Sequence, residues 1–196
     1  MTISLSSYAG GSVNQAQLDA QIIGLKTEYF TVDNMYEAAT AAPAAIAYVG
    51  SGGTDSRFPT RGFDTTSQES LLFTWKVPLN FDIARGFKFD VDWSPTNTNT
   101  GTVRWEVRAL NLTEGAALGQ SHSATGHFSD DTGLGTANNL QTSPTTTEDE
   151  IGGFTKGALV NFRIIRRTDG DTYNADASLI GVRIHYWTDA AIEGSS

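Results

Sequence analysis

Three stretches of the chain alternate apolar and polar residues with a period of two, and this pattern constrains the fold more than any other feature of the sequence. They lie at residues 86–93, 102–110 and 180–186. A period of two sends neighbouring side chains to opposite faces of a β-strand, so each stretch predicts a strand with one face in a core and the other in water. Strands of parallel sheets are buried on both faces and lose this alternation, so the pattern predicts antiparallel sheet.

Less regular stretches predict further strands elsewhere in the chain. These are residues 27–33, 44–49, 70–77, 121–128, 138–142 and 158–166, while the last strand extends over 178–187. The loop at residues 94–101 joins two strands of matching length, which predicts a β-hairpin. Residues 50–67 are rich in glycine and contain Pro59, so they predict a loop.

About eight strands with apolar inner faces predict an all-β fold, an antiparallel β-sandwich of the jelly-roll type. An immunoglobulin-type sandwich is the alternative, but without cysteine the chain lacks the Cys–Trp–Cys pattern of that fold. The predicted core consists of Phe73, Trp75, Phe87, Phe89, Val91, Trp93, Val103, Trp105, Val107, Phe162, Ile164, Val182 and Ile184.

The chain divides into three predicted parts. Residues 1–60 are predicted to be an N-terminal arm or assembly segment, residues 61–190 the β-sandwich domain, and residues 191–196 a polar tail. Within the arm, a serine cap followed by apolar residues at helical spacing predicts a short helix over residues 13–25.

The chain is acidic, with a formal net charge of −9. A nucleic-acid interface needs clustered Lys and Arg, so the total argues against a nucleic-acid partner. No apolar run approaches the roughly 20 residues of a membrane span, which argues against a membrane partner. The one basic cluster, Arg163, Arg166 and Arg167, is interpreted as a strand end that pairs with carboxylates such as Asp169 and Asp171, in preference to a polyanion site.

The densest group of oxygen ligands is formed by Asp169, Asp171, Asn174 and Asp176. Calcium favours several such oxygens from one loop, but the spacing departs from that of a calcium loop and no bidentate Glu follows. Asp and Asn also stabilise turns through hydrogen bonds to the backbone, and this interpretation is favoured over calcium.

Other signatures of chemistry are weak. His122, His127 and His185 are interpreted as surface or interface histidines, because zinc needs at least three well-placed ligands. No nucleophile elbow, phosphate loop or dinucleotide fingerprint occurs in the sequence. The sequence therefore predicts no catalytic, cofactor-binding or metal-binding residue, no cofactor, and a protein that is not an enzyme.

Tryptophans are candidates for sugar binding, because exposed aromatic rings stack on sugars. Trp75, Trp93 and Trp105 fall on the core faces of their strands and are predicted to be core residues. Trp187 continues the polar register of the last strand, so it is predicted to be either exposed or at a subunit contact.

Residues 64–187 resemble a family of structural proteins of tailed bacteriophages. The first similarity is a strand that ends in a proline followed by an aspartate, here Pro78 and Asp82; the second is a V-x-W-E-V motif within residues 93–107. The third is a final hairpin, whose matching positions are Phe162, Arg163, Ile164, Arg166, Asp171, Tyr173, Asp176, Ala177, Leu179, Gly181, Val182, Ile184 and Tyr186.

The resemblance implies a jelly-roll-like structural virion protein that is made in the host cytoplasm. Such a protein would be a capsid decoration, cement or head-fibre subunit that forms a homotrimer and docks on the major capsid protein or other virion proteins. Exposed apolar residues would be needed at its interfaces, and the candidates are Phe30, Tyr36, Tyr48, Ile165 and Trp187.

Two other functions stay open on the sequence. One is a tail-associated receptor- or carbohydrate-binding module, which predicts exposed aromatic residues around one loop cluster and a binding role for Trp187. The other is a polysaccharide hydrolase, which would need two carboxylates converging in a cleft, and the sequence shows no such pair.

Overall fold

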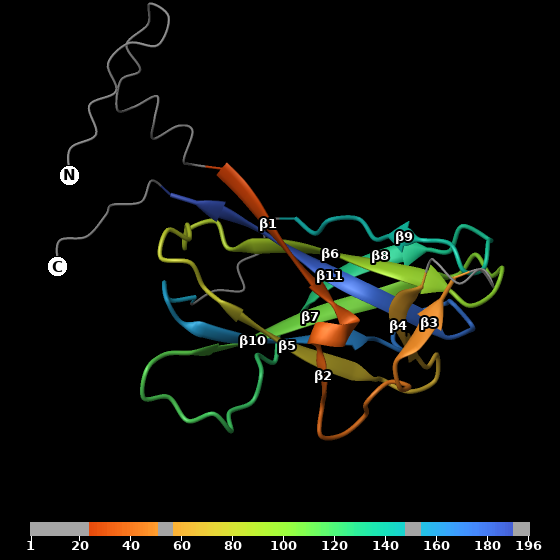
Figure 1. The fold of residues 1–196 in the computed structure, drawn as a ribbon, viewed down its shortest axis with the longest axis horizontal. Coiled ribbons are helices and arrows are strands. Elements are labelled where there is room, and N and C mark those ends of the chain that lie inside the picture. The colour runs from red at the N-terminus through yellow and green to blue at the C-terminus, as the bar shows by residue number, and fades with distance from the viewer. Residues whose placement is uncertain (1–23, 51–56, 148–153, 190–196) are drawn as a thin grey trace, which may run out of the picture.

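The computed structural model describes residues 24–50, 57–147 and 154–189, and this part of the chain is almost entirely β-structure (Figure 1). Its strands are β1 Gly24–Thr31, β2 Tyr36–Glu37, β3 Ala47–Val49, β4 Phe58–Phe63, β5 Ser70–Lys76, β6 Phe87–Pro95, β7 Thr102–Leu112, β8 His127–Thr132, β9 Gln141–Thr142, β10 Leu159–Arg166 and β11 Ala177–Thr188. A single 3-10 turn, η1 (Val32–Asn34), is the only helical element that the structure describes. No described helix has the length and apolar character that a membrane span requires.

The strands form two antiparallel sheets. The six-stranded sheet has the order β3-β4-β11-β6-β9, and β1 also pairs with β11. The five-stranded sheet has the order β2-β5-β10-β7-β8. The long strands of both sheets run along the long axis of the molecule (Figure 1). The predicted antiparallel β-sandwich is confirmed.

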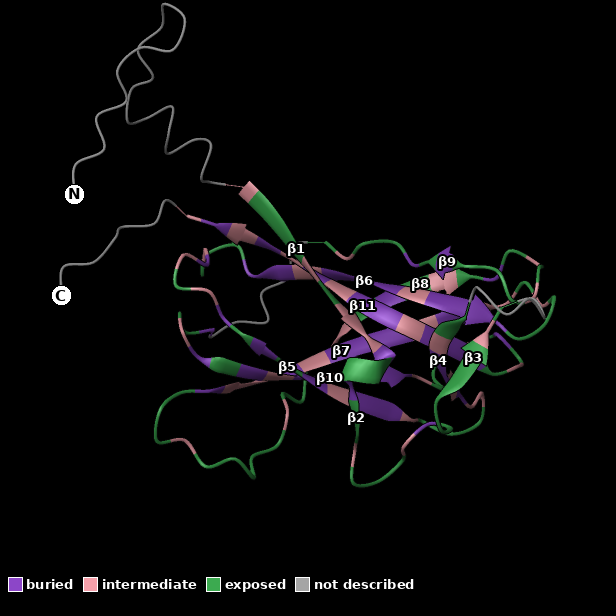
Figure 2. Ribbon diagram, viewed as in Figure 1, coloured by how far each residue is buried: buried purple, intermediate pink, exposed green. Residues whose placement is uncertain are grey.

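The core lies between the two sheets, where the apolar members of the alternating strands meet. Every residue of the predicted core is buried, and Figure 2 shows burial concentrated in the central strands, while β3 and the loops are largely exposed. Aromatic rings dominate the contacts; the ring centroids of Phe73 and Phe162 lie 5.1 Å apart, as do those of Trp75 and Tyr186. The placement of Trp75, Trp93 and Trp105 in the core is also confirmed.

The predicted hairpin between β6 and β7 is wrong. β6 pairs with β11 and β9 in one sheet, whereas β7 pairs with β10 and β8 in the other, so the loop between them crosses the sandwich. The final hairpin of the phage-like pattern is wrong as well, because its two strands, β10 and β11, lie in different sheets. Alternation determines which side chains point inward, but it carries no information about which strand lies alongside, and consecutive strands can face each other across a core as readily as they can pair.

A strand was missed in the predicted loop at residues 50–67. β4 begins at Phe58 and pairs with β3 on one side and with residues 177–179 of β11 on the other. Pro59 and Gly62 interrupt the sequence signal for a strand. The two neighbouring strands stabilise the extended conformation here although local propensity opposes it.

The described part of the predicted arm belongs to the sandwich. β1 pairs with β11 over eight residues, from Gly24 opposite Thr188 to Thr31 opposite Gly181. The predicted boundary at residue 60 falls inside β4. Most of the predicted helix over residues 13–25 lies outside the described residues, but its last two residues, Gly24 and Leu25, are in a strand.

Candidate binding site

A pocket of about 430 Å³ opens on the outer face of the six-stranded sheet, which is called the pocket face below. Its volume is within the range of small-ligand sites, roughly 300–1,000 Å³. Its apolar walls come from β1, β3, β4, β11 and the segment before β9, and are formed by Tyr29, Val49, Phe58, Pro59, Leu140 and Ile180. Its polar lining includes Asp92, Ser94 and Asn138.

Tyr29 owes its position to a glycine on the neighbouring strand. It lies opposite Arg183 in the β1–β11 ladder, and its ring covers Gly181. A Cβ atom at Gly181 would lie 2.6 Å from the Tyr29 ring and 2.7 Å from the Phe30 carbonyl oxygen, so only glycine lets the ring approach the sheet this closely. Burial, followed by the charge and hydrogen bonding of Asp92, raises the pKa of Tyr29 to about 12. The phenol therefore stays protonated at neutral pH and can donate a hydrogen bond.

Asp92 is held in place by partners on both neighbouring strands. Its Oδ1 accepts hydrogen bonds from Nη2 of Arg183 at 2.7 Å and from the Thr142 hydroxyl at 2.6 Å. A guanidinium and a hydroxyl donor on opposite sides fix the orientation of this carboxylate, and the charge-assisted bond from Arg183 is the stronger of the two. One carboxylate is thus presented at the pocket with its direction set by the sheet.

The same face carries a wider network of paired charges. The Arg183 guanidinium also donates from Nε to Asp90 at 2.5 Å, and Asp90 lies directly opposite it on β6. His185 places Nε2 2.7 Å from the second carboxylate oxygen of Asp90, and its Nδ1 lies 2.7 Å from the Thr27 hydroxyl. Opposite charges in directly opposed positions stabilise a sheet.

Ser94 is a buried polar residue of the pocket. Its side chain is 1% exposed, and among the described residues its hydroxyl has no hydrogen-bond partner. A buried hydroxyl without a partner in a folded protein calls for an explanation. A polar ligand in the pocket is one such explanation.

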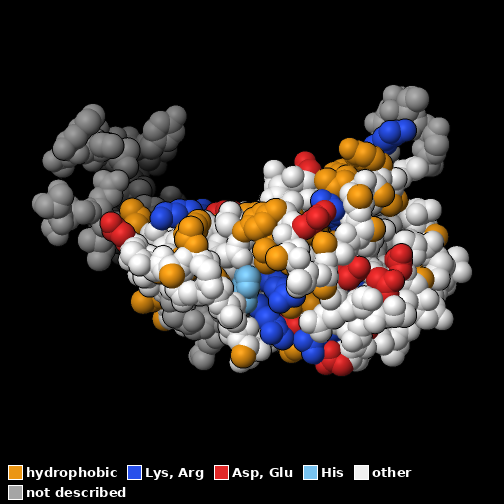
Figure 3. Space-filling view, turned by 90° about the horizontal axis from the view of Figure 1, so that it is seen from below, with side chains coloured by type: hydrophobic (Ala, Val, Ile, Leu, Met, Phe, Trp, Pro, Cys, Tyr) orange, Lys and Arg blue, Asp and Glu red, His pale blue; other side chains and the backbone are white. Residues whose placement is uncertain are grey.

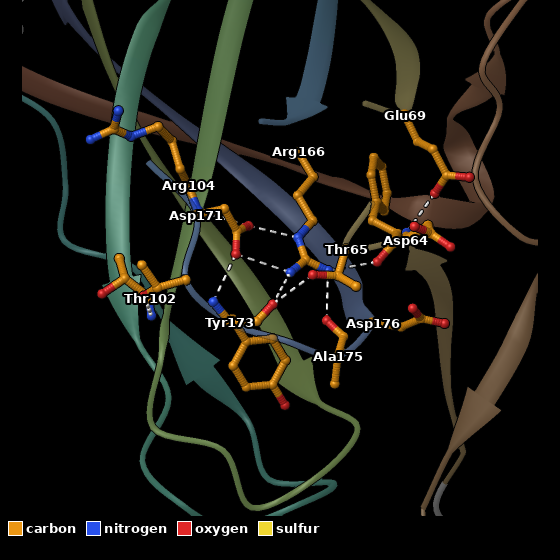
Figure 4. Close-up of polar contacts among 12 residues, drawn as sticks. Asp64, Thr65, Glu69, Thr102, Arg104, Arg166, Asp171, Tyr173, Ala175 and Asp176 are labelled. Atoms are coloured by element: carbon orange, nitrogen blue, oxygen red, sulfur yellow. Dashed lines mark hydrogen bonds and ion pairs between the residues drawn. The ribbon is translucent and has the colours of Figure 1, made fainter. Parts of the chain in front are cut away.

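The predicted basic cluster divides into two kinds of residue. The buried Arg166 binds Asp171 through Nε at 2.7 Å and Nη2 at 3.1 Å. It also donates to the carbonyls of Phe63, Tyr173 and Ala175, so its guanidinium is enclosed by the loop after β10 (Figure 4).

Arg167 is paired as well, with Asp169 at 2.7 Å and with Glu106 at 3.1 Å. The predicted pairing is thus confirmed for Arg166 and Arg167. It is wrong for Arg163, for which no ion pair to a described carboxylate exists.

The predicted oxygen cluster serves the turn after β10. Asp171 also accepts a hydrogen bond from the Tyr173 backbone amide at 2.9 Å, while the Asn174 side chain bonds to that of Asn99. Within the described ranges, no three His, Asp or Glu side chains are grouped so that they could hold a metal ion. The arrangement agrees with the turn interpretation.

The structure separates the three histidines. His122 contacts Asn161 on the outer face of the five-stranded sheet, and His185 belongs to the charge network of the pocket face. His127 begins β8. They do not form a common site.

The predicted interface residues differ in their exposure. Ile165 is fully buried, so that expectation is corrected, whereas Phe30 is partly buried and packs against Phe73 with ring centroids 4.8 Å apart. Tyr36 and Tyr48 are exposed. Trp187 is partly buried beneath the guanidinium of Arg85, 4.5 Å from its ring centroid, and it is not part of the pocket.

Sequence reasoning missed Tyr29, Phe58 and Asp92 as members of one site. One signal was present: the outward register of the last strand contains a glycine, Gly181, where a side chain was expected. A glycine inside a strand often marks the close approach of another group. The group itself could not be identified without the β1–β11 pairing.

Comparisons with known proteins show a likeness in fold at low similarity. No protein-family model and no curated protein matches the sequence. A family 35 carbohydrate-binding module from an environmental isolate is 11% identical over 76% of this chain and 90% of that chain, with a TM-score of 0.40. A carbohydrate-binding module specific for non-crystalline cellulose is 15% identical over 82% of this chain and 87% of that chain, with a TM-score of 0.42.

A third similar structure is a cycloisomaltooligosaccharide glucanotransferase from Paenibacillus sp. It is 15% identical over 76% of this chain, with a TM-score of 0.38, and the matched region spans only 17% of that enzyme. Identities and TM-scores this low carry no argument about function, which must come from the site.

Proposed function

We propose that this chain is a non-catalytic carbohydrate-binding domain and that the pocket on the six-stranded sheet holds the saccharide. The observation that carries the proposal is the joint presence of Tyr29 and Phe58 with the fixed carboxylate of Asp92 in one pocket. Phe58 is 59% exposed and Tyr29 is 45% exposed, so both rings have surface available to a ligand.

This combination matches the two kinds of surface that a sugar ring offers. The C–H faces of a sugar are apolar and pack against aromatic rings, which contribute large contact area at low conformational cost. The hydroxyl groups at the ring edge need acceptors and donors. The Asp92 carboxylate and the Tyr29 phenol oxygen supply acceptors, since the phenol proton is engaged by Asp92, and the Asn138 amide has both donors and an acceptor.

Isothermal titration calorimetry with soluble oligosaccharides selected on a glycan array tests the proposal. Phe58→Ala should weaken binding by about 10-fold or more, since burying a Phe side chain contributes roughly 1.5–3 kcal/mol. Asp92→Asn should weaken it by a similar factor, because an amide replaces a charged acceptor. The matched control is Phe128→Ala, which removes an aromatic ring of similar exposure from the other sheet and should leave affinity unchanged.

Two results would contradict the proposal. One is the absence of any saccharide on the array that binds the wild-type chain. The other is equal affinity in wild type, Phe58→Ala and Asp92→Asn, which would place the ligand elsewhere. Trp187→Ala serves as a second control, because this tryptophan lies outside the pocket.

A second candidate function, assembly as a structural virion subunit, is favoured by the free edge of β1. This eight-residue strand pairs with β11 alone among the described strands. An unpaired strand edge exposes backbone donors and acceptors on which a strand of another chain can add. The phage resemblance, the homotrimer and the capsid partner stay predictions.

Light scattering and hydrogen–deuterium exchange test the assembly role. Assembly through β1 predicts a multiple of the 21.0 kDa chain mass and slowed exchange at β1 amides as concentration rises. A monomer at all concentrations that also fails to cosediment with virions would contradict this role without affecting the carbohydrate proposal.

A further inference from the structure

Arg163 is the member of the predicted basic cluster that forms no ion pair with a described residue. It lies on the outer face of the five-stranded sheet, which is called the arginine face below, between Leu72 of β5 and Arg108 of β7. Its Nε atom is buried and has no hydrogen-bond partner among the described residues. An unpaired guanidinium donor that is removed from water costs free energy unless a ligand satisfies it.

The residue directly across the ladder makes this position more unfavourable. Arg163 and Arg108 are paired in register on adjacent strands, and like charges directly opposite each other destabilise a sheet. Burial and then the positive charge of Arg108 lower the pKa of Arg163. The charge of Glu106 acts in the opposite direction, but its carboxylate forms its ion pairs with Arg108 and Arg167, so Arg163 has no ion-pair partner among the described residues.

Neighbouring carboxylates neutralise the other arginines of this face. Glu106 binds Nε of Arg108 at 2.8 Å and Nη1 of Arg167 at 3.1 Å, and Asp169 also binds Arg167. Within the described part of the chain, Arg108, Arg163 and Arg167 thus share two carboxylates, which leaves one positive charge of this group uncompensated. Arg104, further along β7, is engaged by Asp130.

Polar groups border the arginine pair. His122 lies near both guanidinium groups, and burial, followed by the charges of Arg163 and Arg108, lowers its pKa. Its Nε2 is 2.7 Å from the Asn161 amide oxygen, and the Asn161 amide nitrogen donates to the Tyr36 hydroxyl. Figure 3 shows a histidine and a group of basic side chains lying side by side on this side of the molecule.

We propose that Arg108 and Arg163 form a binding site for a carboxylate group of a small ligand. The guanidinium group presents its donors as a planar fork that matches the two oxygens of a carboxylate. A carboxylate carries a single negative charge, which equals the uncompensated charge of the cluster, whereas a phosphate dianion would exceed it. The net charge of −9 opposes general anion attraction, so binding depends on this local geometry.

This site is independent of the saccharide pocket, because the two lie on the outer faces of different sheets. The carboxylate can come from a free organic acid or from an acidic sugar. The two sources share the same recognition chemistry, and the ligands of the test distinguish them.

Nuclear magnetic resonance of the arginine Nε–Hε groups in the full chain tests the site. The probes are acetate, glucuronate and, as the neutral partner, glucose, each at constant ionic strength kept with chloride. We expect saturable shifts of the Arg163 signal with acetate and glucuronate and none with glucose. A lower dissociation constant for glucuronate than for acetate would identify an acidic sugar as the source. Equal dissociation constants would identify a free organic acid.

Variants separate this site from nonspecific charge effects. Arg163→Gln should weaken acetate binding by about 10-fold, read from the Arg108 signal, because it removes the charge-assisted hydrogen bonds of one guanidinium group. Arg163→Lys keeps the positive charge but loses the planar fork of donors. Its acetate affinity should therefore lie between those of wild type and Arg163→Gln. Arg85→Gln, an exposed arginine at another place in the fold, should bind like wild type.

Three outcomes would overturn the inference. They are shifts that never saturate, equal affinity in wild type and Arg163→Gln, or a phosphate titration that is tighter than acetate. If Arg163→Gln does not fold, Arg108→Gln takes its place, and acetate binding is then read from the Arg163 signal.

Discussion

The pocket face and the arginine face arise from the same alternating pattern, yet their charges are arranged differently. On the pocket face, Arg183 lies directly opposite Asp90 and also binds Asp92. On the arginine face, Arg163 lies directly opposite Arg108. Paired charges make the first face a rigid support for a pocket, while the second face keeps an unsatisfied donor. The difference shows that an outward polar position has no functional meaning until its cross-strand neighbour is known.

The largest effect is expected from removing the carboxylate at the centre of the pocket-face network. Asp90→Ala leaves Arg183 and His185 without their shared acceptor, and the side chain of Asp90 is only 5% exposed. We expect the free energy of unfolding to fall by about 3 kcal/mol, because the substitution removes the nearly buried acceptor of several hydrogen bonds, from Arg183, His185 and Thr145. Urea denaturation measures it. A loss no greater than that of Arg163→Gln would remove the proposed contrast between the faces.

A glycine on each face allows a matched pair of substitutions. Gly181→Ala puts a Cβ 2.6 Å from the Tyr29 ring and 2.7 Å from a backbone oxygen, so it should cost about 2 kcal/mol of unfolding free energy and weaken saccharide binding. Gly126→Ala puts a Cβ 1.9 Å from the Glu106 carboxylate, which would move and weaken its contact with Arg108. It should alter carboxylate binding while leaving saccharide binding intact. Calorimetry with both ligands distinguishes the two results.

Asp131 connects the two sheets and provides a prediction on pH. Its carboxylate, on β8, accepts a hydrogen bond from Nε1 of Trp93, on β6, at 2.7 Å, and burial raises its pKa. A carboxyl group whose pKa is higher in the folded state stabilises fully at pH values below its unfolded pKa, and this contribution is lost as pH rises through the folded pKa.

Asp131→Asn keeps an oxygen acceptor for Trp93 and removes the titration. The unfolding free energy of this variant, measured relative to wild type, should therefore increase from acidic to neutral pH. Thermal denaturation at a series of pH values measures it, and a difference that stays constant with pH would contradict the prediction.

The smallest effect on stability is expected at the unpaired arginine itself. Arg163→Gln removes a charge that has no partner and relieves repulsion with Arg108, so the unfolding free energy should stay within about 0.5 kcal/mol of wild type or rise. Arg183→Gln, the equivalent change on the pocket face, should be clearly destabilising. A large loss of stability in Arg163→Gln would mean that this residue has a structural partner outside the described chain.

The sequence predicted which residues point into the core far better than it predicted which strands pair with each other. Phe89 and Trp105 were correctly placed in the core because alternation depends only on the local backbone. The predicted β6–β7 hairpin was wrong, and β4 was missed, because pairing depends on segments that are distant in sequence. Of the candidate pocket, the sequence contained the unexplained Gly181 but nothing that brings Tyr29, Phe58 and Asp92 together.

The sequence by itself determined an antiparallel β-sandwich, the identity of its aromatic core and the outward position of its charges. A period of two is imposed by the pleat of each strand, so it can be read within a few residues. Only the tertiary structure decided that Arg166 is enclosed by its loop, that Arg183 is paired and that Arg163 is not. These outcomes depend on register between strands far apart in the chain, where a shift of one residue would exchange the faces of every side chain.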